Sequence, residues 1–192
     1  MSFLDNLITL PDQRLRQESR DVNIKNDDIQ ALSVKMQNTV LEWEQTRPHE
    51  VGVALSAIQI AEPYKVVVVR RDFSDKNNRE FITLINPVIT KFNKTQQLDY
   101  EGCLSIVDIY GSVPRYTKVT VRALSLEGKD IQIEADGFMA RVLQHEIDHT
   151  HGVMFIDHIK QADSFYNLSD TGLLEKISYQ KIMQMEDLWV MA

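Results

Sequence analysis

Two histidines in a stretch of helical period constrain this sequence more than any other feature. Residues on one stripe recur at helical spacing over residues 137–150, and Gly152 follows as a natural helix stop. His145 and His149 are four residues apart, so they lie one turn apart on one face of the predicted helix. They can therefore present two imidazole nitrogens to one metal ion. Glu146 is rotated away by about 100 degrees, so it can reach a metal-bound water without being a ligand.

This arrangement is typical of a metal-assisted hydrolase, which needs protein ligands, a general acid/base and an open coordination position. A third ligand is required. No other histidine has a spacing that matches one cleanly, and we expect these residues to be solvated or capping: His49, His151 and His158. Cys103 is the remaining thiol, in a small-residue turn over residues 101–105. A thiolate there would suit a divalent transition metal, and a Cys/His/His set would leave a fourth position for water.

The composition favours one globular domain in a reducing compartment. The chain has 192 residues, enough for one compact domain and short for two, so we expect a single domain over residues 1–192. A single cysteine excludes an internal disulfide framework. The net charge of -7 makes nucleic acid a poor partner, because a phosphate backbone needs a basic surface.

Targeting signals are not visible in the sequence. The N-terminus lacks a basic region followed by a long apolar run, and the longest apolar run, residues 66–69, is far too short to span a bilayer. We therefore expect no membrane partner and a cytoplasmic location, or the interior of an organelle if the chain is a trimmed form.

The remaining pattern predicts an α+β fold. Residues 27–45 carry an apolar stripe after capping side chains, which predicts an amphipathic helix. Strand-like segments follow at residues 65–70, 81–85, 88–92, 118–126 and 131–135, with a polar loop at residues 72–80. A last apolar stripe predicts a C-terminal helical extension at about residues 160–192. In this fold, mainly antiparallel strands pack around the central histidine-bearing helix, with one helix at each end of the chain.

Three ordered motifs carry a family resemblance. Residues 101–105 read EGCLS and residues 144–149 read QHEIDH. Residues 52–59 read GVALSAIQ, with Ala54 and Ser56 at two positions of a Gly-x-Gly-x-Ala-Ala-x-Gln run. Together these segments resemble the second, third and first motifs of the peptide deformylases, and three ordered motifs are stronger than one. The resemblance covers roughly residues 10–159.

The resemblance implies a specific reaction. Peptide deformylases remove the formyl group from the N-terminal formylmethionine of newly made polypeptides and release formate. One divalent metal ion, usually Fe2+ and replaceable by Zn2+, Ni2+ or Co2+, would be bound by Cys103, His145 and His149. Glu146 would take a proton from the bound water and pass it to the departing amine. Gln59 and the backbone N–H of Leu104 would hold the formyl oxygen and the oxyanion that develops on it.

The resemblance also implies a substrate pocket and its support. The slot for the methionine side chain would be lined by Val53, Ala54, Gly102, Phe138, Arg141 and Val142. The aliphatic stem of Arg141 would line the slot while its charged head stays in solvent. Glu101 and Arg115 would form an ion pair behind the cysteine turn and orient the metal ligands.

Formylmethionyl nascent peptides are the implied partners. In some relatives a basic terminal helix docks on the ribosome, so the ribosome exit region is a candidate partner. Here Lys176 and Lys181 are offset by four acidic residues nearby, which disfavours that mode of docking.

Two departures in the first motif leave other functions open. Ala54 replaces a glycine that allows close backbone approach, so we expect retained activity with altered affinity. One alternative is a zincin-like peptidase or a deacylase of another small N-acyl group. Peptidases with this histidine motif usually take a further His or Glu as third ligand, so Cys103 discriminates against them. Another alternative is a homologue that binds metal without turnover, which the intact Glu146 and Gln59 disfavour.

Overall fold

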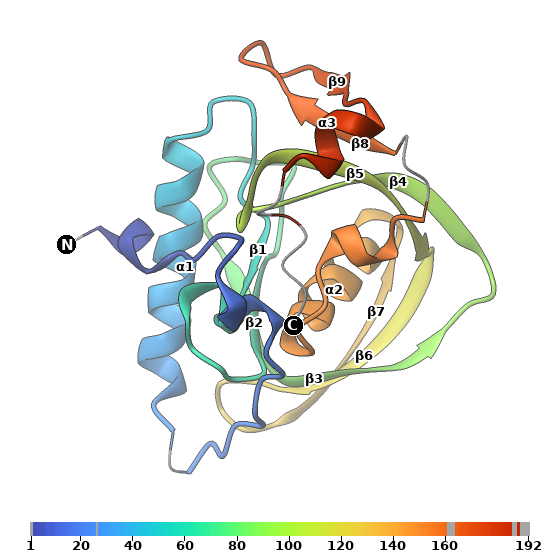
Figure 1. Ribbon diagram of the computed structural model, residues 1–192. Helices are drawn as coiled ribbons and strands as arrows, with labels where there is room; N and C mark the ends of the chain where they lie inside the picture. The colour runs from blue at the N-terminus through green and yellow to red at the C-terminus, as the bar shows by residue number, and fades with distance from the viewer. Residues whose placement is uncertain (1, 26, 161–163, 186–187, 189–192) are drawn as a thin grey trace.

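Two antiparallel sheets surround one helix, α2 (Gly137–Thr150), on several sides (Figure 1). The computed structural model describes residues 2–25, 27–160, 164–185 and 188. Helix α2 contacts strands of both sheets, and a second helix, α1 (Ile29–Gln45), covers the outer side of the first sheet. This arrangement confirms the α+β prediction with antiparallel strands around a histidine-bearing helix.

The first sheet has five strands and the second has four, and all neighbouring strands are antiparallel. The first sheet runs in the order β1 (Ala54–Ser56), β2 (Val66–Arg70), β3 (Phe81–Phe92), β6 (Lys118–Leu124) and β7 (Asp130–Asp136). The second runs in the order β4 (Gln96–Cys103), β5 (Ile106–Tyr116), β8 (Phe165–Leu168) and β9 (Leu174–Lys176). Short helical turns lie outside the strands: η1 (Phe3–Asn6) and η2 (Gln13–Arg16) precede α1, η3 (Ala57–Ile60) follows β1, and η4 (Phe155–His158) follows α2.

The valine run of β2 lies between the two helices. Val67 and Val69 pack in the cluster that includes α2, whereas Val66 and Val68 pack in the cluster that includes α1. Successive side chains of a strand point to opposite faces, so a continuous apolar run is needed when both faces are buried. The predicted helix of residues 27–45 corresponds to α1, and its apolar stripe is buried against this side of the sheet.

Strand β3 joins two segments that the sequence predicts as separate strands. Its pairing with β6 shifts register between Ile85 and Val88. Pro87 has no N–H to donate to the ladder, which explains the irregularity at this point. Asn86 adopts a φ of 51°, and its side chain bonds both the N–H and the carbonyl of Val22.

The long β4–β5 hairpin is the largest element that the sequence pattern does not predict. Only residues 98–100 within it look strand-like in isolation. Pairing across the two strands stabilises positions such as Gly111 and Pro114, whose own β propensity is low. The tight turn after Cys103 follows a register shift between Gly102 and Cys103, a bulge of the kind common beside functional sites.

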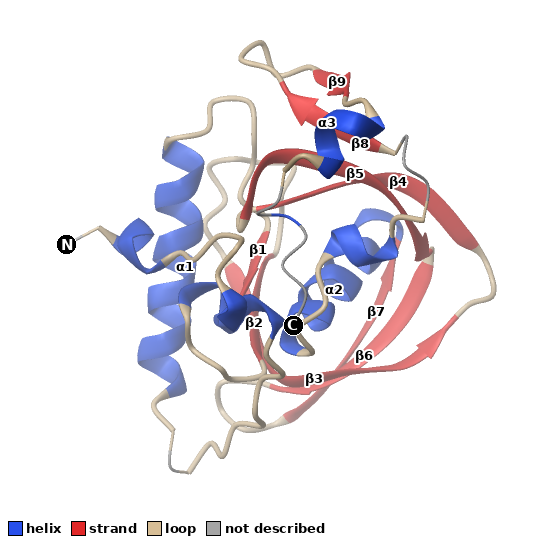
Figure 2. Ribbon diagram, viewed as in Figure 1, coloured by secondary structure: helices blue, strands red, loops and turns tan. Residues whose placement is uncertain are grey.

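The C-terminal region differs from the predicted helical extension. Residues 165–176 form the hairpin β8–β9, and the only helix after it in the described residues is the five-residue α3 (Tyr179–Met183) (Figure 2). The apolar stripe is explained by packing on the second sheet, because Ile177, Ile182 and Leu188 are buried in the cluster around β5. Trp189, which the stripe includes, lies outside the described residues. Within the described part of the chain, no helix has the length and apolarity needed to cross a membrane.

Candidate metal centre and cleft

One sulfur and two imidazole nitrogens converge where the end of β4 meets α2. Nε2 of His149 lies 3.3 Å from Sγ of Cys103 and 3.1 Å from Nε2 of His145. The three donor atoms lie within 4.8 Å of one another. In the part of the chain that the structure describes, no second group of three such donors comes together. A soft sulfur with two imidazoles is a donor set that fits a divalent transition metal.

The two histidines have different electrostatic environments. Burial alone would lower the pKa of His145, but its contacts with Cys103 and Glu101 raise that pKa well above the usual value. Burial and the neighbouring charge of His145 lower the pKa of His149 well below the usual value. Nδ1 of His145 lies 2.9 Å from Oε2 of Glu101 and donates there, so in the neutral form of the ring the lone pair is on Nε2, which faces the other donors.

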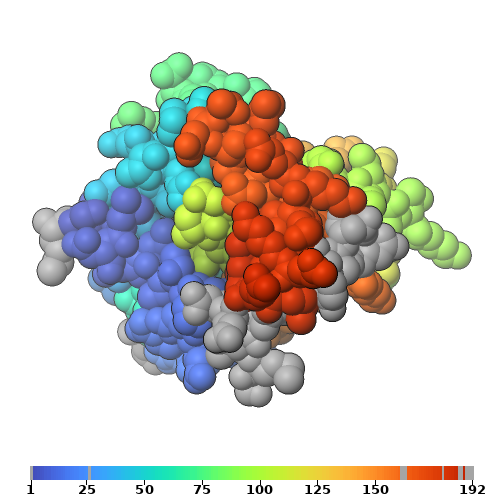
Figure 3. Space-filling model, turned by 45° about the horizontal axis from the view of Figure 1, so that its top comes forward, coloured from blue at the N-terminus to red at the C-terminus, as the bar shows by residue number. Residues whose placement is uncertain are grey.

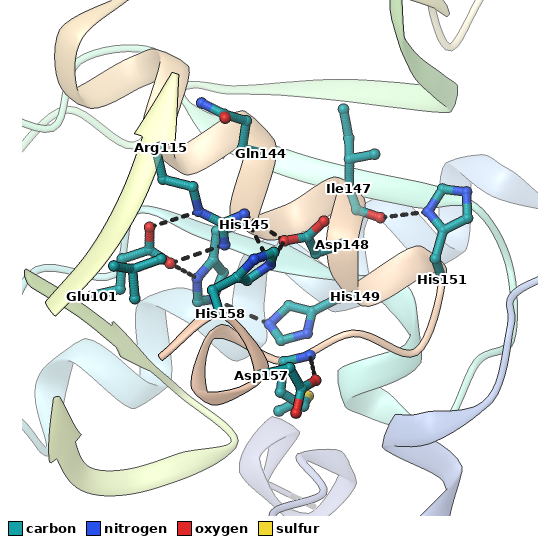
Figure 4. A network of polar contacts seen from close by, with 12 residues as sticks. Glu101, Arg115, Gln144, His145, Ile147, Asp148, His149, His151, Asp157 and His158 are labelled. Atoms are coloured by element: carbon teal, nitrogen blue, oxygen red, sulfur yellow. Dashed lines mark hydrogen bonds and ion pairs between the residues drawn. The ribbon is translucent and has the colours of Figure 1, made fainter. Parts of the chain in front are cut away.

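Glu101 is the centre of a buried polar network behind the three donors (Figure 4). Arg115 donates to both of its carboxylate oxygens, at 2.9 Å and 3.1 Å. Burial would raise the pKa of Glu101, but the hydrogen bonds from His145 and Arg115 outweigh it and hold that pKa far below its ordinary value. Arg115 also donates to Asp148 at 2.5 Å, and Nε2 of His158 lies 2.7 Å from the same oxygen. The ion pair expected between Glu101 and Arg115 is therefore present and extends further than the sequence indicates.

Arg141 is placed differently from the prediction. Its side chain is 7% exposed, so its charged head does not stay in solvent. The guanidinium donates to Oε1 of Glu101 at 2.7 Å and to the carbonyls of Val113 and Gln97 at 2.8 Å and 2.7 Å. It therefore ties α2 to both β4 and β5, and the residue also lines the cleft.

Gln59 reaches the donor cluster from the turn η3, directly after β1. Its Oε1 accepts a hydrogen bond from the backbone N–H of Ser56 at 2.9 Å. Its Nε2 donates to Oγ of Ser105 at 3.1 Å and lies 3.4 Å from Sγ of Cys103. The side chain is 1% exposed, so these bonds fix its amide group beside the sulfur.

Glu146 presents a buried carboxyl to the same site. Burial raises its pKa to about 7. Its Oε2 atom has no hydrogen-bond partner among the described residues. A buried acid with a pKa near neutrality and a free oxygen is suited to accept and return a proton.

A cleft of about 420 Å3 opens in front of these residues. It is lined by all six predicted pocket residues, Val53, Ala54, Gly102, Phe138, Arg141 and Val142, together with Gln59, Cys103, Leu104, His145 and Glu146. Phe138 is 47% exposed and lies at the rim. The structure thus brings together, on one cleft, segments that are separated by more than 80 residues in the chain.

Several lining residues are absent from the sequence-based set. They are Trp43, His49, Glu50, Val51, Phe73, Tyr100 and Tyr110. Phe73 comes from the polar loop after β2, and its ring lies 4.9 Å from that of Phe138. Tyr110 donates to a carboxylate oxygen of Glu50 at 2.5 Å. A single aromatic residue in a polar loop was the available signal for Phe73, and the other residues gave none.

The three histidines outside the pair behave differently from one another. His151 is exposed and bonds the carbonyl of Ile147, in line with the expectation of a solvated or capping residue. His49 lines the cleft. His158 belongs to the network around Arg115, so the expectation for this residue is corrected.

An α+β domain with such a donor cluster in a cleft, beside a buried carboxyl, has the arrangement of a metal-dependent hydrolase. Residues 4–165 match the family model described as polypeptide deformylase. The chain is 35% identical over 167 residues to a peptide deformylase of Thermomicrobium roseum. This aligned region covers 85% of this chain and 90% of the relative. It is 40% identical over 157 residues to a peptide deformylase of Agrobacterium fabrum, with 81% and 86% covered. The chain belongs to the peptide deformylase family, a family of enzymes.

Solved structures of the family show the same fold. A peptide deformylase from Synechococcus elongatus in complex with actinonin superposes with a TM-score of 0.71 at 30% identity, covering 81% of this chain and 78% of that one. A class I type b peptide deformylase from Acinetobacter baumannii with Met-Ala-Ser bound gives a TM-score of 0.69 at 29% identity, covering 80% of this chain and 96% of that one.

Proposed function

We propose that this chain hydrolyses the N-formyl group of formylmethionine at the N-terminus of newly made polypeptides and releases formate. The observation that carries the proposal is the convergence of Cys103, His145 and His149 next to the buried carboxyl of Glu146 in a cleft. Membership of the peptide deformylase family supports the same reaction. We propose that residues 1–192 act as one domain in the cytoplasm, or inside an organelle if the chain is a trimmed form.

Cys103, His145 and His149 would hold one divalent metal ion, for which we propose Fe2+, with Zn2+, Ni2+ or Co2+ able to replace it. When bound, such an ion supplies Lewis-acid chemistry, lowering the pKa of a coordinated water and polarising the formyl oxygen. The Glu101 carboxylate holds the ring of His145 from behind, which fixes the direction of its Nε2 lone pair.

Glu146 would move the proton. Its free Oε2 accepts the proton of the attacking water, and the same oxygen returns it to the departing amine nitrogen. Because burial holds its pKa near 7, the group changes protonation state at little cost around neutral pH.

Gln59 and Leu104 would stabilise the charge that develops on the formyl oxygen. Nε2 of Gln59 is fixed beside the sulfur of Cys103, and Leu104 follows that cysteine in the turn that lines the cleft. Two donors held in place before the reaction stabilise an oxyanion without reorganisation, and each is typically worth a factor of about 10² or more in rate.

The methionine side chain would occupy the apolar part of the cleft. Its walls are Val53, Ala54, Gly102, Phe138 and Val142, with the stem of Arg141. An unbranched thioether side chain fits irregular apolar space well. The reacting formyl group would then lie next to Glu146.

The proposal is tested by formate release from a formyl-Met-Ala-Ser peptide. The protein is purified without oxygen and loaded with Fe2+ or Ni2+, and its metal content is measured. We expect Glu146→Ala to lose turnover by a factor of about 10² or more while it keeps the metal, because proton transfer is removed and the ligands are not. Glu134→Ala, an exposed carboxylate on β7, is the matched control and is expected to keep full activity.

Unchanged formate release by Glu146→Ala would refute its assignment. Cleavage of an internal peptide bond without formate, detected by mass spectrometry, would instead identify a peptidase. If the wild-type protein binds metal but releases no formate from the peptide, deformylation itself is refuted.

A further inference from the structure

The C-terminal hairpin β8–β9 lies against the mouth of the cleft. The match to the family model ends at residue 165, the first residue of β8. β8 pairs with β5, and β9 pairs with β8, so both strands extend the sheet that carries Cys103 (Figure 1). All of the hairpin after Phe165 therefore lies beyond the residues that match the family model.

Tyrosine rings follow one another along one face of that sheet. Gly102, Tyr110 and Tyr166 are cross-strand neighbours on β4, β5 and β8, so this row points to one face. The ring of Tyr110 fills the space beside Gly102, where a Cβ would lie 2.6 Å from it. The ring of Tyr100, two residues before Gly102, meets the ring of Tyr166 edge-on at 4.8 Å. Tyr100 and Tyr110 line the cleft, and Tyr166 supports them from outside it.

The turn of the hairpin contacts the other side of the mouth. Gly172 has a φ of +78°, and a Cβ there would lie 2.8 Å from Cγ and 3.0 Å from Nδ1 of His49. His49 lines the cleft. In Figure 3 the orange surface of the C-terminal hairpin lies directly beside the cyan surface of the segment around residue 50.

The opposite face of the hairpin is anchored in the core. Phe165 is 3% exposed and packs in the cluster that includes Ile109 and Phe155. A hairpin fixed on one face can hold the rings on its other face in place. Side chains that are held before binding lose less rotamer freedom when a ligand arrives, which improves affinity.

Building on the proposed function, we propose that the hairpin β8–β9 positions Tyr100, Tyr110 and His49 as a subsite for the polypeptide that follows the formylmethionine. Tyr166 and Gly172 are positioning residues, since they act through the lining side chains. The hairpin would lower KM for peptides and leave the chemistry at the metal centre unchanged. A substrate without residues after the methionine would not use this subsite.

The test compares formyl-Met-Ala-Ser with formyl-methionine amide on the full, Ni2+-loaded chain. We expect Tyr166→Ala to raise KM for the tripeptide by about five- to tenfold, with kcat unchanged, because one aromatic support is lost. KM for the amide should stay as in the wild type. Tyr166→Phe keeps the ring and is expected to restore the tripeptide KM.

A second variant and a control separate this role from a loss of folding. Gly172→Ala puts a methyl group against the ring of His49 and should also raise KM for the tripeptide alone. Leu173→Ala changes a residue of the same turn that is 65% exposed and should change neither KM. Thermal unfolding of each variant verifies that it is folded.

The result that would overturn the subsite is an equal rise in KM for both substrates, or an unchanged KM in folded Tyr166→Ala and Gly172→Ala.

Calorimetric binding of the product Met-Ala-Ser distinguishes this failure from failure of deformylation. If the wild type releases no formate but Tyr166→Ala weakens Met-Ala-Ser binding, the subsite stands and the proposed reaction fails. If the wild type releases formate and Tyr166→Ala alters neither KM nor Met-Ala-Ser binding, the subsite alone fails. If the wild type neither releases formate nor binds Met-Ala-Ser, both are overturned.

Discussion

Glu101 is the residue on which the charged groups behind the donor cluster converge. Its carboxylate is bonded by Arg115, Arg141 and the ring of His145. In a buried site an unpaired charge is costly, so such a network is stable only when every partner is in place. The guanidinium of Arg141 also satisfies backbone carbonyls of β4 and β5, which makes it part of the scaffold as well as of the site.

Ala54 occupies the position where the resemblance predicts a second glycine. It lies in β1 opposite Val69, is 4% exposed and contacts the cleft. Its φ is not positive, so the methyl group causes no backbone strain. The departure from the motif is therefore compatible with the strand.

At this position we expect Ala54→Gly to keep catalytic turnover and to change KM for formyl-Met-Ala-Ser modestly. The free energy of unfolding should fall by about 1–2 kcal/mol, because a buried methyl and strand rigidity are lost. Urea unfolding and formate release measure the two effects. Ala123→Gly, a similarly buried alanine of β6 outside the cleft, should show the stability loss without the KM change. A large rise in turnover at unchanged stability would show instead that the alanine hinders catalysis.

At the scale of elements, the end of helix α2 is set by a close backbone contact. Gly152 has a φ of +71°, and a Cβ there would lie 2.3 Å from the carbonyl oxygen of Arg16. Gly128, in the turn between β6 and β7, has a similar φ of +74°, but its Cβ would lie 3.6 Å from the flexible end of Ile24. Both glycines have a positive φ, but only Gly152 is in close contact with backbone. Substituting each of them by alanine therefore separates the cost of backbone strain from the cost of a packing clash.

We expect Gly152→Ala to destabilise the fold by about 3 kcal/mol or more, since left-handed strain and a clash with backbone add together. Gly128→Ala should cost only about 1–2 kcal/mol, because it suffers the strain alone. Chemical denaturation of both variants measures the difference. Equal losses would show that the contact between Gly152 and Arg16 relaxes freely.

At the scale of the whole molecule, the donor cluster ties distant segments together. Cys103 and His149 are 46 positions apart and join the second sheet to the central helix. A ligand that binds only the folded state stabilises that state by mass action. Metal binding should therefore couple to global stability.

We expect Ni2+ added to metal-free protein at about 100 times its dissociation constant to raise Tm by roughly 5–10 °C. A chelator should reverse the shift, and Cys103→Ala should abolish it, because one of the three proposed ligands is lost. Differential scanning calorimetry measures the shift. Mg2+, which prefers oxygen ligands, is the control and should have no effect. A full Ni2+ shift in folded Cys103→Ala would exclude this cysteine as a ligand.

The features that depend on local spacing follow from the amino-acid sequence alone. The pair His145 and His149 with Glu146 beside them, the apolar stripe of α1 and the doubly buried β2 each follow from the period of a single element. The motif around Cys103 pointed to the third donor because the residues of a tight turn are contiguous in the chain. When the contacts of a residue lie close to it in the chain, the sequence is enough to predict its place in the structure.

Other features of the site and of the fold depend on contacts between distant segments of the chain. The buried head of Arg141, the part of His158 in the polar network and the rings of Phe73 and Tyr110 in the cleft all depend on partners far away in the chain. Within the predicted helical extension, residues 165–176 form a hairpin instead, and its strand β8 pairs with β5, which lies far away in the chain. Spacing along the chain specifies which face of an element is apolar. Which element covers that face is decided by packing and hydrogen-bond satisfaction over the whole fold.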